Sequence, residues 1–171
     1  MKYKVKKTKI LNFYDIIFLG DFMSEKYYSK LSVNLLLTRE NNGKKEIMLH
    51  LRQNTGFMDN MYDFTCGGHV EKNESYAKAI IREAHEELGI TIKEKDLIFL
   101  IVYHHFQDDY VQVIFTAKNY EGVPIIKESD LCKELLWVDS CNVPENIIPY
   151  MKIILKDIEE KIPYDDSKVE C

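Results

Sequence analysis

Residues 68–90 read GHVEKNESYAKAIIREAHEELGI, and this stretch decides most of what the sequence predicts about the fold. A helix is expected over 75–88, because apolar side chains recur there at helical spacing. Glu74-Ser75 can open this helix, and Gly89 suits the left-handed position that commonly follows a helix. The apolar stripe of the helix consists of Ala77, Ile80, Ile81, Ala84 and Leu88.

Three glutamates occupy one surface of the same helix. Glu83, Glu86 and Glu87 stand at positions i, i+3 and i+4, so their carboxylates are neighbours and repel one another. A hard divalent cation such as Mg²⁺, which takes oxygen ligands, would relieve this repulsion. Arg82 offers one compensating charge, and Glu74 can meet it across two turns. A solvated acidic face is common on helices, and the three glutamates taken alone favour that explanation.

The segments around this helix predict strands on both sides of it. A turn-rich segment at 40–44 indicates a hairpin between the first two strands. A second helix is expected to end near residue 161, before Pro163, and to open either near Pro144-Glu145 or at Pro149. This order favours an α/β protein in which helices cover the faces of a mixed sheet. The strands are expected at 31–38, 46–51, 62–65, 97–103, 110–118 and 134–138.

The whole chain has 171 residues, a length typical of one domain. We expect a core over about 30–161, an N-terminal arm or strand over 1–29 and a frayed tail over 164–171. The first twenty residues are basic and then apolar, but Asn12 and Asp15 interrupt the apolar part, which argues against a signal peptide.

Composition limits the partners of this chain. The formal net charge is −5, so bulk charge does not draw the chain onto a nucleic acid polymer. No run of about 18 apolar residues is present, so no membrane span is expected. The four cysteines form no CxxC pair, which favours free thiols and a cytoplasmic location. The sequence leaves the oligomeric state open, a homodimer included.

The complete spacing of residues 68–90 resembles the Nudix box, G-x(5)-E-x(7)-R-E-U-x-E-E-x-G-U, in which U is aliphatic. Every fixed position is filled, and only Ala84 is small for its aliphatic place. The stretch from Leu49 to Ser75 is also similar to one group of MutT-like bacterial members. The matching positions are Gly68, Glu74, Arg82, Glu83, Glu86, Glu87 and Gly89.

The resemblance implies an α/β/α sandwich that cleaves a diphosphate bond in a nucleoside diphosphate linked to another group. By the same resemblance, Glu83, Glu86, Glu87 and the backbone carbonyl of Gly68 would bind Mg²⁺, or Mn²⁺ in its place. Glu74 and Arg82 would form a structural salt bridge. The catalytic base would be one of the three glutamates or a loop carboxylate. Two loop carboxylates qualify, Glu128 and Asp130.

Substrate-binding residues are less defined. Arg52 ends an expected strand and could hold a phosphate or be a surface arginine. Asn146 could read a purine edge, as an asparagine does in the MutT group, or simply lie at the start of a helix. His104 and His105 are expected in a solvated hairpin loop.

These residues favour a small-molecule nucleotide substrate, most of all a (deoxy)nucleoside triphosphate. The alternatives are a nucleotide sugar or a dinucleotide. Cys66 next to Gly67-Gly68 is similar to a feature of type I isopentenyl diphosphate isomerases, but an extra glycine and the intact glutamates argue against that enzyme. The same glutamates argue against a Nudix domain that only binds nucleotides.

Overall fold

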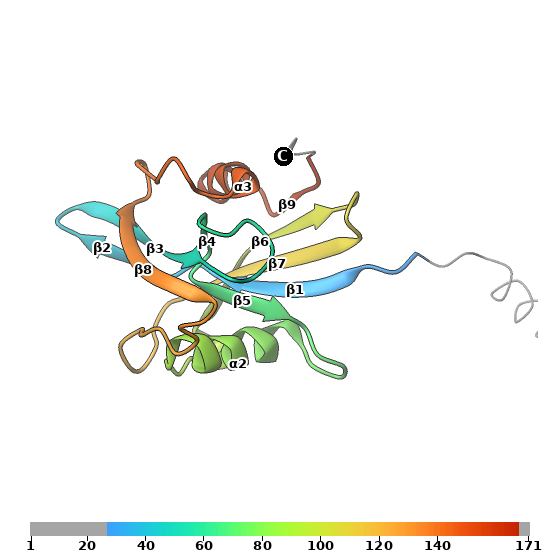
Figure 1. Cartoon of the computed structure of the whole chain (residues 1–171), viewed down its shortest axis with the longest axis horizontal. Coiled ribbons are helices and arrows are strands. Elements are labelled where there is room, and N and C mark those ends of the chain that lie inside the picture. Colours follow the sequence, from blue (N-terminus) through green and yellow to red (C-terminus); the bar gives the residue numbers. More distant parts are fainter. Residues whose placement is uncertain (1–26, 168–171) are drawn as a thin grey trace, which may run out of the picture.

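The computed structural model describes residues 27–167, so nearly all of the arm or strand expected over 1–29 lies outside the described residues. Strands of two sheets form the middle of the molecule. Helix α2 (Tyr76–Leu88) lies on one side of them, and helix α3 (Pro149–Glu160) lies on the other (Figure 1). This is the α/β/α arrangement that the sequence predicts.

The first sheet has five strands and is mixed. Its order is β5-β1-β7-β6-β9. β1 pairs antiparallel with β5 and parallel with β7, whereas β6 pairs antiparallel with β7 and parallel with β9. The strands are β1 (Lys30–Leu35), β5 (Cys66–His69), β6 (Leu97–His105), β7 (Tyr110–Ala117) and β9 (Tyr164–Asp165).

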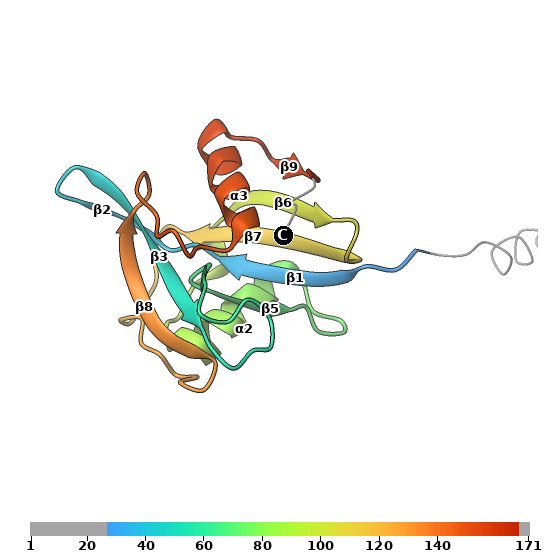
Figure 2. The same ribbon diagram turned by 45° about the horizontal axis from the view of Figure 1, so that its top comes forward.

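The second sheet is antiparallel and contains β2 (Thr38–Asn41), β3 (Lys44–Arg52), β4 (Tyr62–Asp63) and β8 (Cys132–Asp139). β8 runs along β3 (Figure 2). β2 and β3 form the hairpin expected from the sequence. Its turn residues, Asn42 and Gly43, have φ values of 51° and 76°, which the tightest hairpin turns require.

The expected strand over 31–38 is wrong, because the chain changes sheets within it. Leu36 N donates to Phe115 O of the first sheet, and Leu37 O accepts from Met48 N of the second. Both side chains are buried. An uninterrupted apolar run is equally compatible with one strand or with a buried crossover, so periodicity cannot separate the two. The expected strand over 62–65 is shorter in the structure, since β4 ends at Asp63 and the next strand, β5, starts only at Cys66.

Helix α2 has the ends that the sequence predicts. The Ser75 side chain accepts from Lys78 N, and Gly89 adopts a φ of 69°. Ala79, rather than Ala77, completes the buried face with Ile80, Ala84 and Leu88. This face packs on β1 and β5 and forms one core.

Helix α3 begins at Pro149, so the alternative start near Pro144-Glu145 is wrong. Proline favours this first position because its missing N–H would have had no partner inside the helix. Met151 and Ile154 of α3 belong to the second core, together with residues of β3 and β6. A short 3-10 turn, η1 (Glu94–Asp96), precedes β6.

Two further sequence predictions differ from the structure. The frayed tail expected from residue 164 instead begins with β9, which pairs with Val102 and Tyr103. His104 and His105 belong to β6 rather than to the hairpin loop, because the turn spans only residues 106–109. Among residues 27–167, no helix has the length and apolarity needed to cross a membrane.

Candidate active site

Arg82 joins helix α2 to the loop that leads into it. Its Nε and Nη2 atoms each lie 3.0 Å from one carboxylate oxygen of Glu74, and Nη2 also donates to His69 O at 3.2 Å. Both side chains are largely buried, with 24% of Arg82 and 14% of Glu74 exposed. This two-point ion pair fixes the loop over the first turns of α2.

Glu83 and Glu86 both turn toward the same arginine. Arg82 Nη1 donates to Glu83 Oε1 at 2.7 Å and to Glu86 Oε2 at 3.1 Å. Glu83 also lies directly against the backbone of Gly68, where a Cβ atom would come within 2.6 Å of Glu83 Cδ. The glycine therefore allows the carboxylate to approach the β5 loop.

Glu87 lies in an environment short of positive charge. Burial, and then the neighbouring charges of Glu83 and Glu128, raise the pKa of Glu87 to about 8. A hydrogen bond from Gly67 opposes this shift without cancelling it. The carboxylate oxygens of Glu83, Glu87 and Glu128, with few positive charges near Glu87, are ligands of the kind that a hard divalent cation prefers.

The three glutamates are not gathered around one point. In the part of the chain that the structure describes, no three His, Cys, Asp or Glu side chains form the geometry of a metal site. The reason is local, since Arg82 holds Glu83 and Glu86.

Cys66 lies close to Glu83 and Glu87 and is fully buried. Burial, and then the charges of Glu87 and Glu83, raise the pKa of its thiol well above the usual value. A thiol without access to a substrate cannot act as the cysteine of an isomerase, so the structure gives that alternative no support.

Two cavities adjoin the acidic group, and Arg52 and Gly67 line both of them. The smaller one has a volume of about 310 Å³ and is bounded by Glu87 and Glu128, the loop glutamate expected from the sequence. His50 also lines it, with its Nδ1 bonded to Phe64 O. Burial lowers the pKa of His50, so its imidazole is neutral.

Arg52 is an organised side chain rather than a free surface arginine. Its Nη1 lies 2.7 Å from Asp63 Oδ2, and Asp63 is 4% exposed. Its Nη2 and Nε donate to Thr55 Oγ1 and Phe57 O, both at 3.0 Å. The guanidinium thus fixes the loop after β3 at the boundary between the two cavities.

Asn146 contacts that same loop from the segment between β8 and α3. Its Nδ2 donates to Asn60 O at 2.9 Å, and its carbonyl accepts from Tyr62 N. Asn146 is not among the residues that line either cavity. It also does not cap α3, because Ile148 occupies that position.

The larger cavity, of about 830 Å³, contains Asn34, Gln112 and Tyr150, which the sequence did not single out. At its base, Gln112 Nε2 donates to Asn34 Oδ1 at 2.6 Å. Burial lowers the pKa of the His105 ring, so this imidazole is also neutral. The aromatic part of the wall consists of Tyr103, His105, Tyr110 and Tyr150. These residues come from β6, β7 and α3, and only the three-dimensional fold brings them together.

Comparison with known proteins agrees with the box at residues 68–90. The 8-oxo-dGTP diphosphatase of Escherichia coli K12 is 32% identical over 100 residues, which cover 58% of this chain and 74% of that enzyme. The structure of a MutT Nudix hydrolase from Burkholderia pseudomallei matches with a TM-score of 0.66 and 22% identity, covering 78% of this chain and 98% of that one. A MutT protein from Methanosarcina mazei Go1 gives a TM-score of 0.62 at 21% identity over 80% and 97% of the chains.

These two structures share the fold of this chain. The NUDIX domain model matches residues 29–156, well over half of the chain. The protein therefore belongs to the Nudix family as a MutT-like hydrolase, an enzyme that acts on phosphoanhydride bonds.

Proposed function

We propose that this enzyme hydrolyses a nucleoside triphosphate, most of all a deoxynucleoside triphosphate, to the monophosphate and pyrophosphate. The observation that carries the proposal is the position of Glu87, which faces Glu83 and Glu128 beside a cavity bounded by Arg52. The activity named for the relative from Escherichia coli is in accord with it.

The residues fit a bound divalent cation. Glu83, Glu86, Glu87 and the carbonyl of Gly68 would hold Mg²⁺, or Mn²⁺ in its place. When bound, the ion neutralises charge on the phosphate oxygens and lowers the pKa of coordinated water. Arg82 remains tied to Glu74 by two hydrogen bonds, so it can release Glu83 and Glu86 while the loop stays in place.

The protein's own groups would then position the reactants. Glu128 lies beside the acidic group on a separate loop and can accept the proton of the attacking water. Arg52, fixed by Asp63, would present its remaining N–H edge to a phosphate. The neutral ring of His50 would border the same phosphate-sized cavity.

The nucleoside would occupy the larger cavity. Its volume of about 830 Å³ is within the usual range for a small-molecule site. The rings of Tyr110, His105 and Tyr150 offer surfaces for stacking with a base, and the Asn34–Gln112 pair offers amide groups to a base edge. Asn146 would act indirectly, by holding the loop at Asn60.

A panel of substrates tests this function. The purified protein with Mg²⁺ would be given the common nucleoside triphosphates, 8-oxo-dGTP, ADP-ribose, a nucleotide sugar and a diadenosine polyphosphate. We expect monophosphate and pyrophosphate from a triphosphate, with one labelled oxygen in one product when the reaction runs in ¹⁸O-water. Preferred cleavage of the sugar or dinucleotide compounds, to a nucleoside monophosphate and a sugar phosphate or a second nucleotide, would change the assigned substrate. No hydrolysis of any compound would contradict the proposal.

A further inference from the structure

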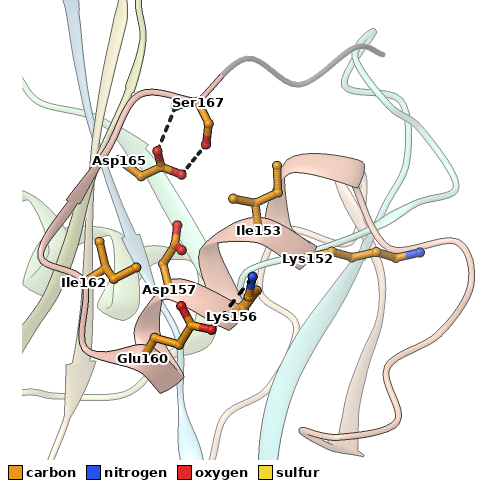
Figure 3. A pocket seen from close by; sticks show the side chains of 8 residues that line it. All are labelled: Lys152, Ile153, Lys156, Asp157, Glu160, Ile162, Asp165 and Ser167. Atoms are coloured by element: carbon orange, nitrogen blue, oxygen red, sulfur yellow. Dashed lines mark hydrogen bonds and ion pairs between the residues drawn. The ribbon is translucent and has the colours of Figure 1, made fainter.

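Acidic side chains gather a second time, between α3 and β9. Asp157 and Glu160 belong to the helix, Asp165 belongs to the strand, and all three line a groove of about 460 Å³ (Figure 3). Because α3 and α2 lie on opposite sides of the sheets, this groove is distinct from the acidic group on α2 (Figure 1).

Asp157 is the unusual member of the group. Only 7% of its surface is exposed, and within residues 27–167 its Oδ2 atom has no hydrogen-bond donor. Figure 3 shows its carboxylate between those of Asp165 and Glu160. A buried carboxylate without a compensating partner is strongly unfavourable, so this position requires a positive charge or a proton.

Asp165 is held in place to face Asp157. Ser167 N donates to Asp165 Oδ1 at 2.8 Å, and the Ser167 hydroxyl donates to Oδ2. Burial alone would raise the pKa of Asp165, but these hydrogen bonds and that of Asp157 leave it below its usual range. Burial and the contact with Asp165 raise the pKa of Asp157. Asp165 is therefore an oriented, charged carboxylate.

Among the described residues, no basic side chain forms an ion pair with Asp157 or Asp165, although the charge of Lys156 acts on Asp157. None of the ion pairs of the described residues includes Asp157 or Asp165. Lys156 turns to Glu160, at 3.8 Å, and its side chain is 71% exposed. Lys152 lines the rim of the groove. Burial, and then the charges of Asp165, Asp157 and Asp166, raise the pKa of the nearby Tyr103.

We propose that Asp157 and Asp165 together bind one hydrated divalent cation of the Mg²⁺ or Mn²⁺ type, which links β9 to α3. Ions of this type keep several waters and need only one or two carboxylates from a protein, which is the number that converges here. The groove is large enough for those waters, and Glu160 adds a negative charge at its edge. A proton shared by the two carboxylates is the other way to satisfy Asp157, and the titration below distinguishes the ion from the proton.

Such an ion would also affect the larger cavity near the active site. Ser167, which holds Asp165, lines that cavity as well as the groove. Its carbonyl accepts from Tyr103 OH at 2.5 Å. A cation that fixes Asp165 and Ser167 would therefore stabilise the part of the wall that contains Tyr103.

Counting bound Mn²⁺ tests the proposal, by calorimetric titration of the wild type, Asp157→Asn and Asp165→Asn. We expect each variant to lose one equivalent of Mn²⁺ and part of the rise in Tm that Mg²⁺ produces. Glu159→Gln, an exposed change of equal charge on the same helix, should keep both. If Asp157→Asn does not fold, Asp165→Asn provides the same measurement.

Repeating the titration with Glu87→Gln separates this site from the active site. Loss of ions in Glu87→Gln and in Asp157→Asn should be additive, since the two sites share no residue. If the active site binds no metal, the equivalent lost in Asp157→Asn remains measurable. An unchanged Mn²⁺ count in both aspartate variants, with Tm depending on pH but not on Mg²⁺, would show that the pair holds a proton and would overturn the proposal.

Discussion

The carboxylate of Glu83 lies against the backbone of Gly68, so closely that a Cβ atom at Gly68 would come within 2.6 Å of Glu83 Cδ. Gly68→Ala should therefore displace Glu83 and lower kcat/KM by about a hundredfold, as misplacement by about 1 Å can do. The φ angle of Gly68 is outside the left-handed region, so alanine meets no backbone strain. Kinetics and circular dichroism of the variant check this.

A double-mutant cycle shows whether the effect passes through Glu83. In a Glu83→Ala background, Gly68→Ala should have little further effect on kcat/KM, because the group it displaces has been removed. Additive losses would mean that the glycine acts on something else, such as its own carbonyl.

Glu87→Gln should lower kcat by about a thousandfold, on the order of 4 kcal/mol of transition-state stabilisation, while the fold is kept. The amide preserves the shape of the side chain but removes the charge that a divalent cation would need. Glu71→Gln, an exposed change outside the helix, is the matched control. Turnover near that of the wild type in Glu87→Gln would contradict the role of this glutamate.

The raised pKa of Glu87 predicts how the stability of the metal-free protein changes with pH. The unfolded chain has the ordinary pKa of 4.5, whereas the folded chain has a pKa of about 8. Folding therefore favours the neutral form, and stability is lost as pH rises through this interval. In EDTA, urea unfolding should show the wild type close to Glu87→Gln near pH 5. At pH 8 the wild type should be less stable, by a few kcal/mol. A difference that does not vary with pH would contradict the shift.

The sequence predicted the neighbourhood of α2 well because its determinants are local. The Ser75 cap, the left-handed Gly89 and the apolar stripe act within a few residues of one another. The change of sheets at Leu36 and Leu37 could not be predicted in this way. It depends on partners at Phe115 and Met48, which are distant in the chain, and an apolar run is the same in either sheet.

The same distinction between local and long-range determinants decides which parts of the candidate site could be predicted from the sequence. The acidic helix face is a matter of spacing, so it could be read from the sequence. Asp63 gave a weaker signal, an acidic residue within an apolar strand, which requires a partner when buried. That partner proved to be Arg52, eleven residues earlier. The shared wall of Tyr103, Tyr110 and Tyr150 could not be predicted, because it exists only once β6, β7 and α3 pack together.

Arg82→Ala should destabilise the protein much more than the loss of an exposed ion pair does. It would leave Glu74 partly buried without its partner, at a loss of about 2–3 kcal/mol in the free energy of unfolding. Lys93→Ala removes an exposed partner of Glu121 and should change this free energy by less than about 1 kcal/mol. Urea unfolding of both variants compares them directly. Equal losses would mean that the Glu74–Arg82 pair does not hold the loop.

Arg52→Lys should raise KM for the nucleotide about tenfold and change kcat little, because an ammonium cannot reproduce the planar fork of a guanidinium. Lysine keeps the charge, but it cannot reach Asp63, Thr55 and Phe57 O together. Arg39→Lys, which alters an exposed arginine paired with Glu46, is the matched control and should leave KM unchanged. If Arg52→Lys also leaves KM unchanged while the loop stays ordered, Arg52 serves only the loop after β3, and the phosphate is bound elsewhere.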